Sequence, residues 1–232
     1  MNTNQIMMTD ADIARAQQDF LTKVYGWMVG GLLLTAVTAW YTFISGFWMQ
    51  IASNSILFIG LIIGELALVF GLSAKISSVS TFTGAALFLL YSALNGLTLS
   101  VVLAVYTAAS VQQVFLISAA MFAALSVFGY VTKKDLSGVG RFMFMGLIGL
   151  IITMFINFFI GSSMLDFLFS VIGVIIFAGL TAYDTQKLKD MYMVQFEEGD
   201  TAVKASIIGA LMLYLDFVNL FLFLLRLFGN RR

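Results

Sequence analysis

The chain has 232 residues, of which 61% are hydrophobic and 10% are charged, and its formal net charge is zero. A soluble domain carries about 25% charged residues, so this composition indicates an integral membrane protein. His, Cys and Pro are all absent, which excludes Ser-His catalysis, His-ligated or thiolate metal sites and disulfide bonds. The balanced charge gives no reason to expect a nucleic-acid partner.

The chain divides into a polar start and a long apolar remainder. Residues 1–23 carry five charged side chains, so we expect a cytoplasmic tail or an amphipathic helix at the membrane interface. Residues 24–232 are expected to form one domain of transmembrane helices in the lipid bilayer, because a helix crosses the hydrocarbon with about 20 apolar residues. Seven stretches qualify: 24–44, 55–74, 82–106, 112–131, 142–160, 165–183 and 207–228.

The basic residues predict which side each loop faces. Nine Lys and Arg residues lie in the N-terminal tail and in the second, fourth and sixth loops, whereas the first, third and fifth loops have none. The positive-inside rule therefore predicts a cytoplasmic N-terminus. Arg226, Arg231 and Arg232 disagree with this topology. Either the earlier helices fix the orientation, or the last segment is re-entrant and returns to the cytoplasm; we favour seven full spans.

Few polar side chains lie deep in the spans, where a carboxylate costs roughly 2.5–3.5 kcal/mol on insertion scales. Asp216 stands near the centre of the last span, and we interpret it as functional. Glu65, in the second span, fits a structural partner and an ion-path residue equally well. Asn95 and Asn157 are typical of hydrogen bonds between helices.

The last span carries a polar stripe on an otherwise apolar helix. Asp216, Asn219, Phe223 and Arg226 fall within an arc of about 80°, and we expect this stripe to face the interior of the bundle. Arg226 is near the end of the span, so its side chain is expected to extend to the interface.

A second carboxylate, Asp184, closes the preceding span directly after Tyr183. It can meet Asp216 if the sixth helix continues past it, which residues 185–188 permit. Two ionised carboxylates about 4 Å apart repel by roughly 4 kcal/mol at an effective dielectric of 20. The pair would then share one proton near neutral pH and lose it in alkaline conditions. A protein without histidine could thus respond to physiological pH.

The deprotonated oxygens of the pair would suit Ca²⁺, which takes carboxylates, amide carbonyls and water. Glu65, Asn219 and Asn157 could support such an ion path if they line the same cavity. We expect no resident cofactor, and we expect Ca²⁺ at Asp184 and Asp216 only in transit.

Four segments carry a resemblance to a known family. Residues 179–186 read GLTAYDTQ, residues 213–221 read LYLDFVNLF, residues 133–137 read KKDLS and residues 224–226 read LLR. Together they resemble the signature of the transmembrane Bax inhibitor motif family, in particular its bacterial inner-membrane members. The resemblance covers all seven spans.

The resemblance implies an all-α membrane fold in which the last of seven helices is central and wrapped by the other six. It implies a pH-sensitive Ca²⁺ leak with Asp184 and Asp216 as the proton sensor. The family's acidic residue in the second span matches Glu65, and the nearest candidate for a basic latch is Lys75. The cell-death role of eukaryotic members does not transfer to a bacterial-looking chain.

Other functions compete with the leak. Intramembrane aspartyl proteases also place Tyr-Asp on one span and Asp on the next, but their glycine before the second acid and their Pro-Ala-Leu motif are missing, so we do not expect an enzyme. A non-transporting regulator or interaction partner of other membrane proteins would use residues 1–23 and 190–200 as handles. A proton-coupled transporter for an organic solute remains a further alternative.

Overall fold

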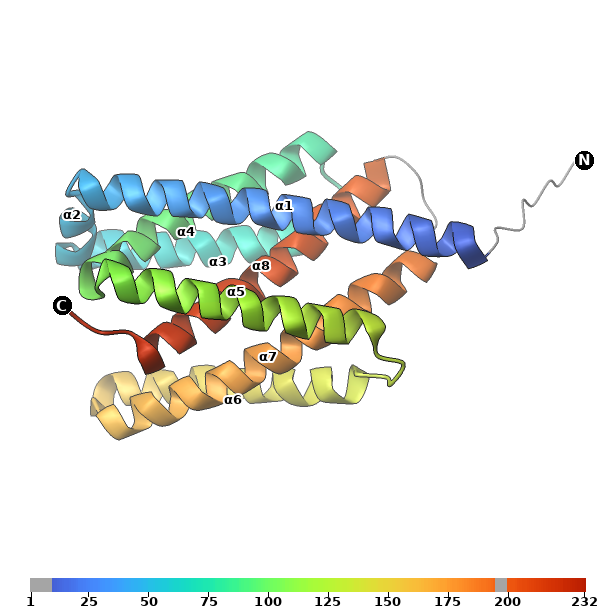
Figure 1. The fold of residues 1–232 in the computed structure, drawn as a ribbon. Coiled ribbons are helices and arrows are strands. Elements are labelled where there is room, and N and C mark those ends of the chain that lie inside the picture. Colours follow the sequence, from blue (N-terminus) through green and yellow to red (C-terminus); the bar gives the residue numbers. More distant parts are fainter. Residues whose placement is uncertain (1–9, 195–199) are drawn as a thin grey trace, which may run out of the picture.

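The computed structural model describes residues 10–194 and 200–232, and nearly all of them are helical. Seven of the helices in this described part are long and apolar enough to cross a membrane, and the short α2 is the exception (Figure 1). The elements are α1 (Asp10–Ile44), α2 (Phe47–Ser53), α3 (Ser55–Lys75), α4 (Thr81–Val105), α5 (Ala108–Val131), α6 (Ser137–Ile160), α7 (Ser163–Val194) and α8 (Asp200–Phe228).

The long helices alternate in direction, so the two ends of the described chain lie on opposite sides of the bundle (Figure 1). We call these the N-terminal side and the C-terminal side. The last residues pair with the loop between α4 and α5: the Thr107 amide donates to the Asn230 carbonyl at 3.0 Å, and the Arg232 amide donates to the Val105 carbonyl at 2.9 Å. The last segment is therefore a full span and does not turn back.

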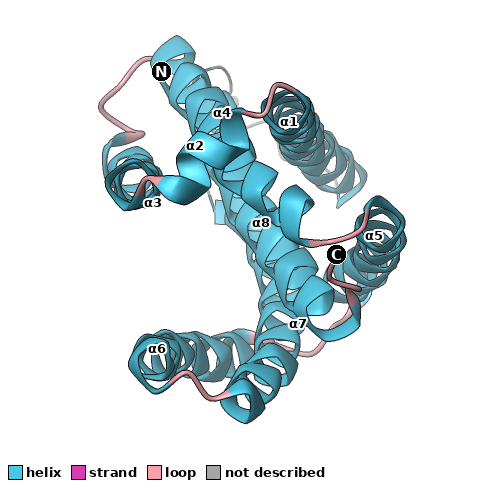
Figure 2. Ribbon diagram, turned by 90° about the vertical axis from the view of Figure 1, so that its left-hand side faces the viewer, coloured by secondary structure: helices cyan, strands magenta, loops and turns pink. Residues whose placement is uncertain are grey.

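Helix α8 is the centre of the bundle. Of its most apolar 18-residue window 72% is buried, against 39% for α7 and 6% for α3. Helices α1, α4, α5 and α7 pack directly on α8, α3 does so over a shorter length, and α6 packs on α7 (Figure 2). Helix α6 faces α8 across a cavity that both helices line. The all-α fold with a central last helix is thus confirmed.

Local capping explains where several helices begin. The Asn54 side chain accepts hydrogen bonds from two amides in the first turn of α3, and Ser80 and Thr107 each accept one at the starts of α4 and α5. Such caps stabilise a helix by about 1 kcal/mol each. Gly46 and Gly161 have positive φ angles of 76° and 69°, which lets the chain turn sharply between α1 and α2 and between α6 and α7.

Three helices extend beyond the stretches that hydropathy predicts. Helix α1 begins at Asp10 and therefore includes residues 10–23. The sequence predicted a tail or a separate interfacial helix over residues 1–23, of which residues 1–9 lie outside the described part of the chain. Helix α7 continues past Asp184 to Val194, and α8 begins at Asp200, so helices occupy most of the expected linker 184–206. Apolar content marks only the part of a helix inside the hydrocarbon, and these polar turns continue the same helices outside it.

Small residues set the closest approaches between helices. A methyl group added at Gly129 of α5 would overlap the carbonyl oxygen of Ala182 in α7. Likewise, a Cβ at Gly209 of α8 would lie 2.7 Å from the Leu188 side chain. Close backbone approach of this kind is the usual means of helix association in lipid, where burial of apolar surface gives little driving force.

Candidate functional site

The two intramembrane aspartates line one cavity of about 1140 Å³. Its walls come from α6, α7 and α8, with Leu66 contributed by α3. All four members of the predicted stripe on α8, namely Asp216, Asn219, Phe223 and Arg226, lie on its wall. Tyr183 of α7 lines it as well, so the Tyr-Asp dipeptide faces the stripe.

Asp184 and Asp216 are brought together across the α7–α8 interface, close enough for their carboxyl groups to interact. Asp216 is only 4% exposed. No amide, hydroxyl or basic group in the described part of the chain donates to its buried Oδ2 atom. Because two ionised carboxylates both lack a donor, a hydrogen bond between them would require that one carboxyl carry a proton. The structure therefore places two carboxyl groups next to each other in the wall of one cavity.

The run around Asp184 also holds α7 in place. Gln186 accepts a hydrogen bond from the Leu136 amide at 2.8 Å and donates to the Lys134 carbonyl at 2.9 Å. The same loop is closed by Asp135, which accepts from the Ser137 amide at 2.8 Å. Hydrogen bonds from the Ser137 side chain and then its amide hold the pKa of Asp135 below its usual range. Gln186 thus fixes the start of α6 to α7, half a turn beyond Asp184.

Basic side chains share the cavity with the carboxyl pair. Arg141, Lys187 and Arg226 all line it, and Lys187 interacts electrostatically with Asp184. Lys187 stands three residues after Asp184 on α7, which is a spacing that places two side chains on one helix face. This spacing is visible in the sequence and could have predicted that Lys187 lies beside Asp184. Arg141 carried no such signal, because it comes from another helix.

Glu65 lies in a second cavity of about 450 Å³ between α3, α4 and α8. It accepts hydrogen bonds from Asn95 at 3.3 Å and from Thr98. Asn95 in turn accepts from the Tyr214 hydroxyl at 3.0 Å, and that hydroxyl is 2.6 Å from Thr35 Oγ1. A chain of hydrogen bonds therefore links α3, α4, α8 and α1, and its central member, Tyr214, is fully buried.

The two cavities adjoin along α8. Asn219 and Arg226 line both of them, together with three leucines: Leu66, Leu215 and Leu222. Within residues 10–194 and 200–232, no three acidic side chains come close enough to hold a metal ion together. Glu65 and the aspartate pair are therefore two separate acidic sites along the same side of α8.

Two further predicted residues lie elsewhere. Asn157 donates to Asp166 at 2.7 Å and bonds both backbone groups of Ser162, so it closes the turn between α6 and α7 and lines neither cavity. Lys75 is exposed at the end of α3 and also lines neither. The expected partner handles fall partly on residues 1–9 and 195–199, which are outside the described residues.

Comparison with known proteins agrees with this architecture. The family described as inhibitor of apoptosis-promoting Bax1 matches residues 17–232. The chain belongs to the Bax inhibitor family. It is 54% identical over 218 residues to inner membrane protein YbhL of Escherichia coli, covering 93% of each chain. It is 46% identical to an uncharacterized protein of Deinococcus radiodurans, covering 98% of this chain and 97% of that one.

A further relative is an uncharacterized membrane protein of Streptococcus pyogenes, which is 39% identical over 230 residues, 98% of each chain. These descriptions establish a membrane protein of this family, and the Escherichia coli relative is named for the inner membrane. None of these descriptions names an ion, a substrate or a catalytic activity.

Proposed function

We propose that the protein is a pH-sensitive leak pathway for cations, with Ca²⁺ as the permeant ion, in a bacterial inner membrane with its N-terminus in the cytoplasm. The observation that carries the proposal is the adjacent pair of Asp184 and Asp216 on a cavity wall within the spans. Acids inside a bilayer are expensive and typically mark ion or proton pathways.

The pair would act as a gate through its shared proton. At acidic pH the proton bridges the two carboxyls and holds α7 against α8. At alkaline pH the proton leaves, and two charges about 4 Å apart would repel by roughly 4 kcal/mol at an effective dielectric of 20. That repulsion moves the helices apart and leaves two anionic oxygens facing the cavity, so cation flux rises with pH.

The path beyond the gate would follow the polar face of α8. Asn219 lies on the wall between the two cavities and Glu65 lies in the second. An amide oxygen and carboxylates are the ligands that Ca²⁺ accepts. Because these groups are spread along the helix rather than gathered, they favour passage of the ion over tight binding.

Flux measurements in liposomes test this function directly. The purified protein is reconstituted with a Ca²⁺ indicator inside, and flux is followed from acidic to alkaline pH. In Asp184→Asn or Asp216→Asn, the introduced amide donates to the remaining carboxyl without a proton. We therefore expect low flux that no longer rises with pH.

The control for this experiment is Asp19→Asn, which removes an exposed carboxylate of α1 outside both cavities. It should keep the pH dependence of the unaltered protein. Flux that stays unchanged in both aspartate variants would contradict the leak. The regulator alternative would gain if a membrane partner then bound equally well to the double aspartate variant.

A further inference from the structure

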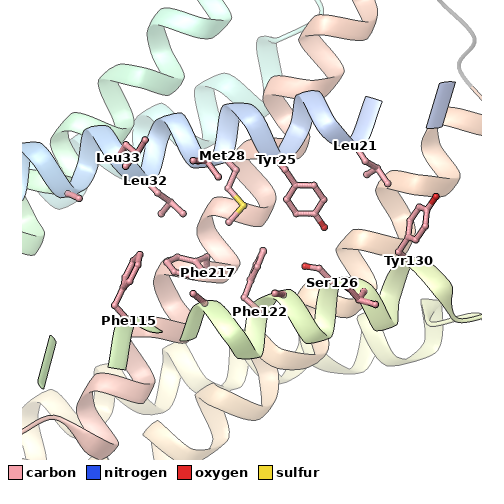
Figure 3. Close-up of a pocket in the computed structure, with 15 residues that line it drawn as sticks. Leu21, Tyr25, Met28, Leu32, Leu33, Phe115, Phe122, Ser126, Tyr130 and Phe217 are labelled. Atoms are coloured by element: carbon pink, nitrogen blue, oxygen red, sulfur yellow. The ribbon is translucent and has the colours of Figure 1, made fainter. Parts of the chain in front are cut away.

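A third cavity, of about 550 Å³, lies on another face of α8 (Figure 3). Its two long walls are α1 and α5, and Phe217 of α8 contributes to its floor. Its size is in the range of sites for small organic ligands. Because α1 and α5 are both membrane-spanning helices, the space between them opens sideways toward lipid rather than toward water.

This cavity is apolar at one end and carries hydroxyl groups at the other. Leu32 of α1 and Phe115 of α5 line its end toward the C-terminal side, whereas Tyr25, Ser126 and Tyr130 line its end toward the N-terminal side (Figure 3). A bound molecule that matches this gradient has a long apolar part pointing to the middle of the bilayer. Its polar group then lies near the N-terminal surface.

Ser126 is the polar group that lacks a partner. It is 7% exposed, and its buried hydroxyl makes no hydrogen bond within the described part of the chain. Two other buried serines, Ser92 of α4 and Ser118 of α5, donate to the carbonyl one turn earlier, namely Phe88 at 2.9 Å and Val114 at 2.8 Å. A hydroxyl left unsatisfied in an apolar cavity is unfavourable, so it points to an acceptor on a bound molecule.

A cation stands beside the polar end of the cavity. The Lys189 ammonium lies 5.2 Å from the centre of the Tyr130 ring and donates to the Tyr130 carbonyl at 2.9 Å. Aromatic and basic side chains together are typical of the membrane surface, and basic groups between spans attract anionic headgroups.

We propose that this cavity binds one acyl chain of an anionic phospholipid. The apolar chain lies between α1 and α5 against Phe217, a carbonyl oxygen of the lipid accepts a hydrogen bond from Ser126, and the phosphate lies near Lys189. Phospholipid is the occupant because the cavity opens into the bilayer and its hydroxyl end is on the same side as the cation.

The test uses the full-length protein in nanodiscs of phosphatidylglycerol whose acyl chain carries a photoactivatable diazirine. Adducts are mapped by mass spectrometry after illumination. We expect them to concentrate on residues of α1 and α5 that line the cavity. Ala119→Phe fills the cavity and should lower this labelling about tenfold or more, and Ser126→Ala should lower it about fivefold, as loss of one hydrogen bond predicts.

Matched variants separate this effect from misfolding. Ala120 is the exposed neighbour of Ala119 and lies outside the cavity, so Ala120→Phe should label like the unaltered protein, and so should Ser118→Ala. Lys189→Met should remove the preference for phosphatidylglycerol over phosphatidylcholine. Adducts spread evenly over the lipid-facing helices, or unchanged in Ala119→Phe, would overturn the proposal. So would stronger labelling by a photoactivatable free fatty acid.

Discussion

Tyr214 of α8 contacts two other helices, α1 and α4, through one polar atom. Its hydroxyl contacts Asn95 and Thr35, and its ring packs edge-on against Phe88 and Tyr91. Tyr214→Phe keeps the ring and removes the hydroxyl. Hydrogen bonds between membrane helices average about 0.6 kcal/mol with a maximum of about 1.7 kcal/mol, so we expect a loss of about 1 kcal/mol in the free energy of unfolding.

Unfolding of purified Tyr214→Phe in detergent measures this loss. Tyr41→Phe is the control, because Tyr41 is 69% exposed and its change should have little effect. Equal stability of the two variants would mean that the buried hydroxyl adds nothing to the bundle.

Glu65 differs from the aspartate pair in having conventional donors. Asn95 and Thr98 both donate to it, and a glutamine keeps one of the two side-chain oxygens that accept these bonds. We predict that Glu65→Gln folds normally and lowers Ca²⁺ flux in liposomes at every pH, because one carboxylate of the path is lost. The pH at which flux is half-maximal should stay where it is, since Asp184 and Asp216 are unchanged. A shift of that pH would instead assign Glu65 to the sensor.

The sequence identifies a residue whose charge is energetically costly to place in the membrane. It does not identify a residue whose role depends on contacts with other helices. Asp216 was identifiable because a carboxylate at mid-membrane is expensive, and Asp184 because it belongs to the same motif set. Tyr214 and Arg141 were not, since a tyrosine in a span and an arginine in a predicted loop are both ordinary. Their roles depend on packing between helices far apart in the chain.

At the scale of helices, α5 and α7 meet backbone to backbone beside the aspartate pair. Gly129 touches the Ala182 carbonyl, two residues before Asp184. We predict that Gly129→Ala forces the helices apart and lowers stability by about 1–3 kcal/mol, as overpacking does in other cores. Because α7 carries Asp184, the same change should raise Ca²⁺ flux at acidic pH.

Gly149→Ala on α6 is the matched control, since a methyl group there meets nothing within 4 Å. It should be neutral or slightly stabilising, because alanine favours the helix. Thermal unfolding in detergent compares the two variants, and the interpretation fails if both behave alike.

Helix lengths show why hydropathy located the spans and missed their ends. It gave all seven crossings, because each needs an apolar run of fixed length. Hydropathy also predicted a linker over 184–206, although α7 continues to Val194 and α8 begins at Asp200. Polar turns outside the hydrocarbon leave no hydropathy signal, and contacts such as that of Gln17 with the Lys189 carbonyl involve residues 172 positions apart.

For the whole molecule, the basic residues and the alternating helices together predict the orientation. Ser77 lies in the loop after α3 on the N-terminal side and Ser53 lies at the end of α2 on the C-terminal side, and both are exposed. The chain has no cysteine, so Ser53→Cys and Ser77→Cys each introduce a single thiol. In intact cells whose outer membrane is permeabilised, we expect an impermeant maleimide to label Ser53→Cys only. Labelling of Ser77→Cys alone would reverse the topology.

The attachment of residues 229–232 to the loop between α4 and α5 determines how α8 can move. Backbone hydrogen bonds hold this end, so we expect α8 to tilt about a pivot beside Phe228 rather than to slide along its axis. Asp216 is about 18 Å from that pivot and Asp200 about 42 Å, at 1.5 Å per residue. A tilt that shifts Asp216 by about 1 Å therefore shifts Asp200 by a little over 2 Å. The larger displacement is thus at the start of α8, on the membrane side opposite the attached end.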